Sequence, residues 1–170
     1  MSSFRIKHII MPSEIVIRCS KAIAEKKLNI AFAESATAGR MSSEFSMTED
    51  SGKILRGGIV CYQVFVKEQL LNVPKTTIEN YTPESAQVTQ IIAKQASKIF
   101  NSKITVAITG LTTPGGSEHR AKPVGTIFFH IITPAAKISH RQVFKGDAEK
   151  IVLQAIDKAA QLILESFGDL

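Results

Sequence analysis

The sequence predicts a single α/β domain, a three-layer α/β/α sandwich built around a mixed β-sheet. Helical and extended patterns alternate along the 170 residues, which is typical of sheets covered by helices. Two long runs of β-branched and aromatic residues, 103–109 and 124–132, suit strands that are buried on both faces. The length fits one compact domain, which we expect to occupy residues 1–170.

The first half of the chain alternates between helix and strand. Residues 13–28 follow Pro12 and place apolar side chains at three- and four-residue steps, which predicts a helix. The apolar run 30–34 predicts a short strand that leads through small residues into a second helix. The polar stretch 48–53 has the composition of a mobile segment, and residues 57–62 form the next predicted strand.

The second half begins with a strong helix start. Thr82, Pro83 and Glu84 supply a capping residue, a proline at the first helical position and an acidic residue in the first turn. After the two long strands, residues 138–144 alternate polar and apolar side chains and predict a strand nearer an edge of the sheet. Asp147 caps the closing helix. The predicted order is therefore α, β, α, β, α, β, β, β, α.

Composition excludes several classes of protein. Apolar residues make up 44% and charged residues 21%, as in globular rather than disordered chains. No apolar run approaches the roughly 18 residues of a membrane span, and residues 1–14 lack the features of a signal peptide. Cys19 and Cys61 have no near pairing, which predicts reduced thiols and a cytoplasmic protein.

The charge of the chain fits a small anionic ligand better than nucleic acid. The net charge is +6 and the pI is near 9.4, but the basic residues are scattered and only 6% of residues are aromatic. A basic surface with stacking aromatic residues is therefore poorly supported. The four histidines have no spacing suited to a metal site, and we predict neither a metal nor another cofactor.

A polar turn follows the predicted strand 30–34, at the kind of position where open α/β sheets bind ligands. Glu34 and Ser35 end the strand, and the chain then passes through Thr37 and Gly39 into a helix. Such a turn can present a nucleophile, an oxyanion hole or a phosphate cradle. Alternatively, Ser35 or Thr37 is an ordinary helix cap.

Tyr62 and Lys67 follow the predicted strand 57–62. A buried lysine with a lowered pKa can activate a serine, helped by a nearby tyrosine hydroxyl. No Ser-x-x-Lys pattern is present, so such a pair would be assembled across the fold from Ser35 and Lys67. The alternative is that Tyr62 and Lys67 are surface residues without a role.

A loop of 14 residues, 110–123, joins the two long strands and contains Gly115 and Gly116. Paired glycines let the backbone approach a ligand closely. The pattern is neither a P-loop nor Gly-x-Gly-x-x-Gly. A plain hairpin connection is the alternative, although the length favours a function.

Together these segments resemble the CinA C-terminal domain family of competence/damage-inducible proteins. The family turn Ala-Glu-Ser-x-Thr-Gly-Gly matches residues 33–39, with an alanine in place of the first glycine. The family segment Tyr-Ser-Asn-x-x-Lys matches 62–67 at its two ends. Three further motifs match: the Ser/Thr-Gly-Ile-Ala-Gly-Pro…Gly-Gly loop at 109–116, an intact Lys-Pro-Val-Gly-Thr at 122–126, and Phe-x-Gly-Asp at 144–147.

The resemblance implies a nicotinamide-nucleotide amidase, a hydrolase of pyridine nucleotide salvage that converts nicotinamide mononucleotide to nicotinate mononucleotide and ammonia. It implies that Ser35 attacks the amide, that Lys67 is the base, and that Tyr62 aids proton transfer. It also implies a homo-oligomer. The implied substrate-binding residues are Glu34 in the turn, Thr37, Gly39 and Arg40 around the phosphate, and Thr109, Gly110, Gly115 and Gly116 around the nicotinamide and ribose.

The chain departs from the family pattern close to these residues. Val64 replaces an asparagine, and Thr112 and Thr113 replace alanine and glycine in the loop. A second hypothesis is therefore a divergent relative that binds a nucleotide-like ligand or a protein partner without catalysis. A third, nucleic-acid binding, depends on the positive charge and ranks well behind.

Overall fold

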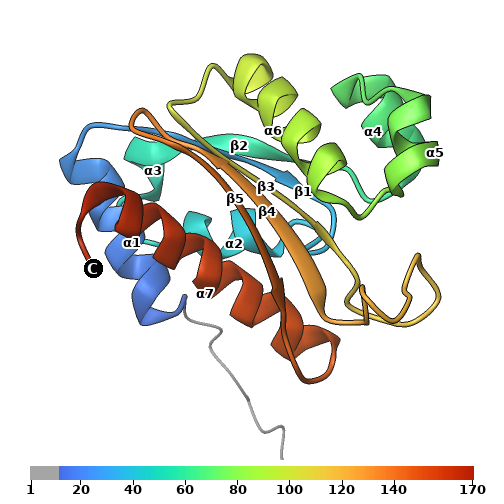
Figure 1. Ribbon diagram of the computed structural model, residues 1–170. Helices are drawn as coiled ribbons and strands as arrows, with labels where there is room; N and C mark the ends of the chain where they lie inside the picture. Colours follow the sequence, from blue (N-terminus) through green and yellow to red (C-terminus); the bar gives the residue numbers. More distant parts are fainter. Residues whose placement is uncertain (1–11) are drawn as a thin grey trace, which may run out of the picture.

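The computed structural model describes residues 12–170, so the N-terminal segment in which no signal peptide is expected lies mostly outside the described part. Its centre is one five-stranded mixed sheet (Figure 1). The strands are β1 (Ile30–Glu34), β2 (Leu55–Val60), β3 (Ile104–Gly110), β4 (Thr126–Ile132) and β5 (Lys137–Val143). Their order across the sheet is β2-β1-β3-β4-β5, with β1 parallel to both neighbours and the last two pairs antiparallel.

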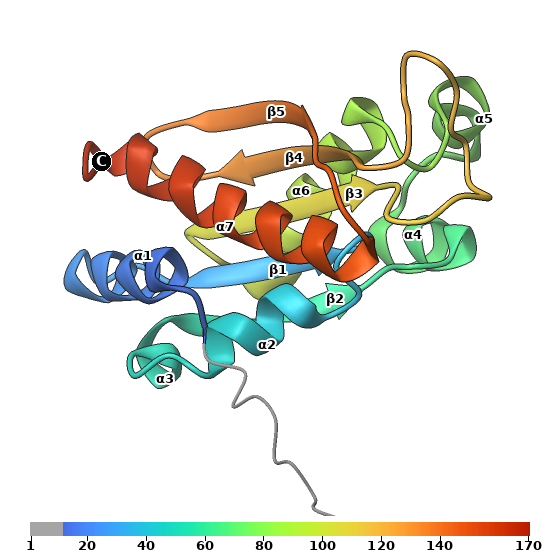
Figure 2. The ribbon, with the colours of Figure 1, turned by 90° about the horizontal axis from the view of Figure 1, so that it is seen from below.

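Helices cover both faces of the sheet, which confirms the predicted three-layer α/β/α architecture (Figures 1 and 2). One face carries α1 (Glu14–Glu25), α2 (Arg40–Ser46), the short α3 (Ser51–Ile54) and α7 (Ala148–Phe167). The other face carries α6 (Ala86–Phe100), against which α4 (Val64–Leu71) and α5 (Lys75–Tyr81) pack.

The hydrophobic core is divided by the sheet into two clusters. Successive residues of β1 show the division, because Phe32 packs among the side chains of α1, α2 and α7, whereas Ala33 packs beneath α6. Every residue of β1 is buried. All but the last residue of β3 and of β4 are buried too, as the near-continuous apolar runs 103–109 and 124–132 predict for strands covered on both faces. Burial of a side chain such as Phe32 contributes about 1.5–3 kcal/mol. β5 alternates between exposed and half-buried residues and lies at an edge, as predicted.

Three segments differ from the sequence-based expectation. The N-cap of α6 is Ser85, whose hydroxyl accepts from the Val88 N–H, whereas Thr82, with a φ of +67°, is the C-cap of α5. Residues 48–53, whose composition predicted a mobile segment, form a turn and the first three residues of α3. The helices α4 and α5 were not predicted, because α4 exposes Phe65 and Leu70 and so lacks an amphipathic pattern.

The carboxyl ends of β1, β2 and β3 meet at one edge of the sheet, which positions the three candidate motifs together. The Ser35 turn follows β1, the segment that leads into α4 follows β2, and the long loop follows β3 (Figure 2). None of the helices within residues 12–170 combines the length and apolar character needed to cross a membrane.

Candidate active site

Glu34 organises the turn that presents Ser35. Its carboxylate is 1% exposed and lies at the start of α2, where it accepts from the main-chain N–H groups of Gly39, Met41 and Ser42 at 2.8–3.0 Å. The hydroxyls of Thr37 and Ser42 also donate to it. A carboxylate at a helix N-terminus satisfies donors that the helix leaves unpaired. Glu34 therefore fixes the path of the chain immediately after β1.

Lys67 is buried and points at Ser35. It shares the inner face of α4 with Leu71, four residues further on, and is 1% exposed. Its Nζ lies 3.0 Å from the Ser35 Oγ, 2.6 Å from the Cys61 carbonyl oxygen and 3.0 Å from the Tyr62 carbonyl oxygen. A lysine ammonium has three N–H donors, and each has one of these acceptors.

This geometry suits a base as well as a donor. When Lys67 loses a proton, two N–H groups can still donate to the two carbonyls, which leaves the nitrogen lone pair directed at the Ser35 hydroxyl. Burial lowers the pKa of Lys67, and electrostatic interactions with Cys61 and Glu84 oppose part of that lowering. The amine is thereby more available as a base near neutral pH than an exposed lysine.

Tyr62 forms a hydrogen bond with Lys67 through its main-chain carbonyl rather than through its hydroxyl. The Tyr62 carbonyl accepts from Nζ, while the phenol ring is 60% exposed at the wall of a cavity. Within residues 12–170 the phenol hydroxyl forms no hydrogen bond to Ser35 or Lys67. The expected help in proton transfer is therefore not built into the site before a ligand binds.

A cavity of about 340 Å³ opens beside Ser35, a volume suited to a small-molecule ligand. Ser35 itself is 6% exposed. The cavity lies between the turn after β1 and the loop after β3. It is lined by Ser35, Ala36, Tyr62, Glu84, Gly110, Leu111, Thr112, Thr113, Pro114, Gly115 and Gly116.

One main-chain N–H group next to Ser35, that of Ala36, is unpaired in the described part of the chain and belongs to a residue that lines the cavity. The Ser35 N–H donates to the Ile108 carbonyl and continues the pairing of β1 with β3. The N–H groups of Ala36 and Thr37 have no acceptor within residues 12–170. Donors that follow a nucleophile in this way can stabilise an oxyanion on the attacked carbonyl.

The loop after β3 is held against the start of α6 by a network that the sequence did not reveal. Lys122, 7% exposed, donates from Nζ to the hydroxyls of Thr82 and Ser117, each at 2.6 Å, and to the Glu84 carbonyl at 3.1 Å. The Ser117 hydroxyl in turn donates to the Glu84 carboxylate. Lys122 stands in the intact family motif, which was the only available signal for it.

Of the four predicted substrate-binding residues at the end of β3 and in the loop after it, three line the cavity and one does not. Gly110, Gly115 and Gly116 line the cavity, as do the neighbouring threonines. Thr109 lies behind it, fully buried, with its hydroxyl 2.8 Å from that of Thr89. Thr109 therefore supports the cavity wall without forming part of it.

The phosphate cradle expected after β1 is occupied by the protein itself. The N–H groups of Gly39, Met41 and Ser42 already donate to Glu34, and the Thr37 hydroxyl does the same. Arg40 donates from Nε to Glu44 at 2.7 Å. None of Glu34, Thr37, Gly39 and Arg40 lines the cavity. These residues build the turn, and this arrangement differs from the direct contact with substrate that the resemblance implies.

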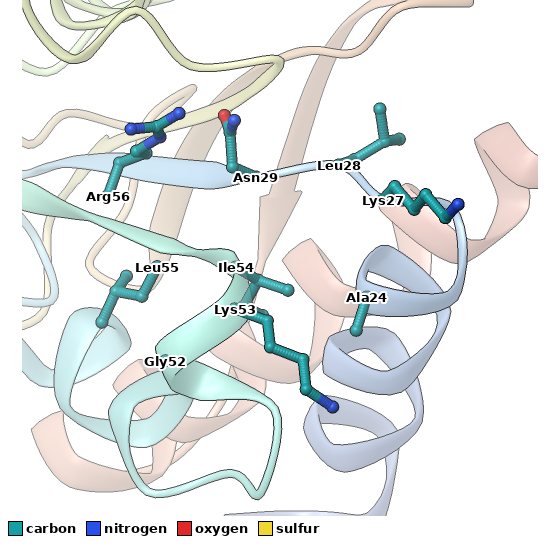
Figure 3. A pocket seen from close by; sticks show the side chains of 9 residues that line it. All are labelled: Ala24, Lys27, Leu28, Asn29, Gly52, Lys53, Ile54, Leu55 and Arg56. Atoms are coloured by element: carbon teal, nitrogen blue, oxygen red, sulfur yellow. The ribbon is translucent and has the colours of Figure 1, made fainter.

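A larger cavity, about 490 Å³, lies at the opposite edge of the sheet, where β1 and β2 begin (Figure 3). It contains Lys27, Lys53 and Arg56, but Figure 3 shows that their charged ends point in different directions. Lys53 is already paired with Asp50 at 2.7 Å. Open α/β sheets bind ligands at the carboxyl ends of their strands, so the smaller cavity beside Ser35 is the better candidate.

The fold and this site define an α/β protein with a buried serine–lysine pair at the carboxyl edge of a mixed sheet. The chain belongs to the CinA C-terminal domain family, whose model matches residues 13–167. A CinA-like protein of Flavobacterium psychrophilum is 32% identical over 88% of this chain. That match covers 35% of the relative, so the chain spans about a third of the length of such curated relatives.

Solved structures of the same superfamily share the fold. The competence damage-inducible protein A of Klebsiella pneumoniae superposes with a TM-score of 0.85 at 22% identity, covering 91% of this chain and 96% of its own. A CinA superfamily protein of Escherichia coli superposes with a TM-score of 0.82 at 25% identity, covering 98% of this chain and 99% of its own.

Proposed function

We propose that the protein is an amidase that hydrolyses nicotinamide mononucleotide to nicotinate mononucleotide and ammonia. The observation that carries this proposal is the 3.0 Å contact between Lys67 Nζ and Ser35 Oγ at the wall of the cavity. A serine becomes a nucleophile when a positioned base accepts its proton. A pyridine nucleotide is the substrate class that the family resemblance implies.

In the first half of the proposed reaction, the Ser35 oxygen bonds to the amide carbon while neutral Lys67 accepts the hydroxyl proton. The N–H group of Ala36 stabilises the resulting oxyanion. The carbon–nitrogen bond then breaks, and the departing nitrogen takes a proton from the Lys67 ammonium to leave as ammonia. An ester between Ser35 and the nicotinoyl group remains.

In the second half, Lys67 accepts a proton from a water molecule that attacks the ester. The ester bond breaks and the proton returns to the Ser35 oxygen, which restores the starting state. Tyr62 lies at the cavity wall and is assigned the proton-transfer role that the resemblance implies, once a ligand orders its hydroxyl. Nicotinate mononucleotide is released.

The departure at residue 64 does not weaken this proposal. Lys67 has three acceptors, from Ser35, Cys61 and Tyr62, and none comes from residue 64. The departures at Thr112 and Thr113 favour the second candidate, a relative that binds a nucleotide-like ligand without turnover, because both side chains line the cavity. A cytoplasmic location and self-association stay predictions.

The test is release of ammonia, with the mass of the product, from nicotinamide mononucleotide incubated with the purified protein. Ser35→Ala is expected to lose turnover by at least about a thousandfold. Ser46→Ala is the matched control, because Ser46 is an exposed serine at the end of α2. No turnover by the folded wild-type protein would favour the binding-only candidate, and full turnover by Ser35→Ala would exclude Ser35 as the nucleophile.

A further inference from the structure

Glu84 is a charged residue of the cavity to which neither the family motifs nor the proposed chemistry gives a role. It precedes Ser85, the cap of α6, and lines the same cavity as Ser35 and Tyr62. The sequence suggested only that it is a first-turn acid, but α6 begins after it.

The Glu84 side chain is held in place by the loop opposite. One carboxylate oxygen accepts from the Ser117 hydroxyl, which itself accepts from Lys122 Nζ at 2.6 Å. Lys122 also binds the Glu84 main-chain carbonyl. Main chain and side chain are thus fixed to the same lysine, directly or through one hydroxyl, so the carboxylate keeps a defined orientation.

The Glu84 charge is not neutralised by a direct ion pair. Within residues 12–170, no lysine, arginine or histidine nitrogen lies within 4.0 Å of its carboxylate oxygens. Glu84 and Ser35 line the same cavity. The Glu84 charge also acts on the serine–lysine pair, because it raises the pKa of Lys67 against the larger effect of burial.

A fixed carboxylate beside a small cavity favours a ligand that carries positive charge close to the group under attack. We propose that Glu84 determines specificity by recognising the positive charge of a pyridinium ring in the substrate. This inference rests on the proposed function, in which the reacting amide is attached to such a ring. The carboxylate attracts the ring while the amide carbonyl lies beside Ser35 and the N–H group of Ala36.

The experiment compares two ligands that differ in ring charge. Nicotinamide mononucleotide has a cationic pyridinium ring, and its reduced form has a neutral dihydropyridine ring with the same phosphate and ribose. Their dissociation constants are measured by calorimetry in the Ser35→Ala background, where no acyl enzyme forms. We expect the oxidised form to bind more tightly, and Glu84→Gln to reduce that preference by about tenfold, as for one partly screened charge pair.

The controls separate charge recognition from other effects. Glu79→Gln removes an exposed carboxylate of α5 that pairs with Lys75, and it is expected to leave the preference unchanged. Ser117→Ala keeps the Glu84 charge but removes its support, so a smaller loss of preference is expected. This second variant also tests the proposal if Glu84→Gln does not fold.

The remaining results test the role of Glu84 and the amidase separately. Equal weakening of both ligands by Glu84→Gln would mean that the carboxylate binds ribose hydroxyls instead of the ring charge. An unchanged preference would remove Glu84 from recognition altogether. Absence of ammonia release by the wild-type protein with the preference intact would overturn the amidase but not the role of Glu84, and absence of binding by either ligand would overturn both.

Discussion

Replacing Lys67 with methionine measures how the buried amine is held. Methionine keeps an unbranched apolar side chain but has no donor for the carbonyls of Cys61 and Tyr62, now 2.6 and 3.0 Å from Nζ. A buried acceptor without a partner costs about 1–3 kcal/mol. Removal of a charge that is 1% exposed opposes this loss. We expect the free energy of unfolding at neutral pH to fall by about 1–3 kcal/mol in total. This is less than the summed cost of two unpaired carbonyl acceptors, because removal of the buried charge offsets part of it.

The pH dependence of this difference is the sharper part of the prediction. Burial lowers the pKa of Lys67 in the folded protein below the ordinary value of 10.5, which the unfolded chain retains. At a pH between the pKa of Lys67 in the folded protein and its pKa in the unfolded chain, the unfolded chain binds more protons than the folded one. The stability of the wild-type protein therefore increases as the pH rises through this window. The methionine variant lacks this contribution. The loss of stability that the substitution causes must therefore grow with pH across that window, by about 1.4 kcal/mol for each unit of lowering.

Urea denaturation of both proteins, from neutral pH to 10.5, gives the difference directly. Lys75→Met is the matched control, because that lysine is 79% exposed and its loss leaves no buried acceptor. The same samples are assayed for amidase turnover, which should fall by at least about a hundredfold without the base. A stability difference that stays constant or shrinks as the pH rises would refute a lowered pKa for Lys67.

Three further predictions each follow from the contacts of one residue. The rate of amide hydrolysis should increase with pH, and the midpoint of the increase should lie below pH 10.5, because only neutral Lys67 accepts the Ser35 proton. A pH profile of kcat/KM measures this midpoint. Glu34→Gln should lower the free energy of unfolding by about 2–4 kcal/mol in chemical denaturation, since an amide cannot accept all five hydrogen bonds. Gly125→Ala should cost about 3 kcal/mol or more in the same assay, because φ is +93° and a Cβ would meet the Phe144 carbonyl oxygen. Gly52→Ala, whose Cβ meets nothing within 4 Å, should change stability little.

The fold was predictable from the sequence where one side-chain pattern decided the structure. The strands at β3 and β4 are buried on both faces, so an almost unbroken apolar run identifies them. The helices α4 and α5 could not be found in this way. Both helices are stabilised by packing against α6, which a local sequence pattern does not show. In addition, α4 leaves Phe65 and Leu70 exposed, so its apolar residues do not repeat with the period of a helix.

The candidate site was predictable in its residue types but not in its contacts. Ser35 and Lys67 are 32 residues apart, and only the meeting of β1 and β2 at one sheet edge brings their polar atoms together. The role of Glu34 was not predictable, because a carboxylate beside a serine can contact either a ligand or a helix start. Three N–H groups of α2 and its cap decide that question in favour of the helix.

The two loop threonines offer the best means of separating the amidase from a relative that only binds. Thr112 and Thr113 line the cavity, and each adds a branched side chain where the family pattern has alanine and glycine. They lie on the loop and not among the acceptors of Lys67, so they should affect the fit of a substrate more than the proton transfer.

The double substitution Thr112→Ala with Thr113→Gly restores the smaller residues of the family pattern. If the branched side chains only narrow the cavity, KM for nicotinamide mononucleotide should fall by several-fold to about tenfold while kcat stays the same, because binding changes without a change in the chemical step. Initial rates over a range of substrate concentrations measure both constants, and Thr76→Ala on α5, outside the cavity lining, is the matched control. A fall in kcat would instead mean that the threonines order the loop for catalysis. If neither the wild-type protein nor the double variant turns over the substrate while both bind it, the serine–lysine pair is a feature of a binding site, and the amidase proposal fails for this chain.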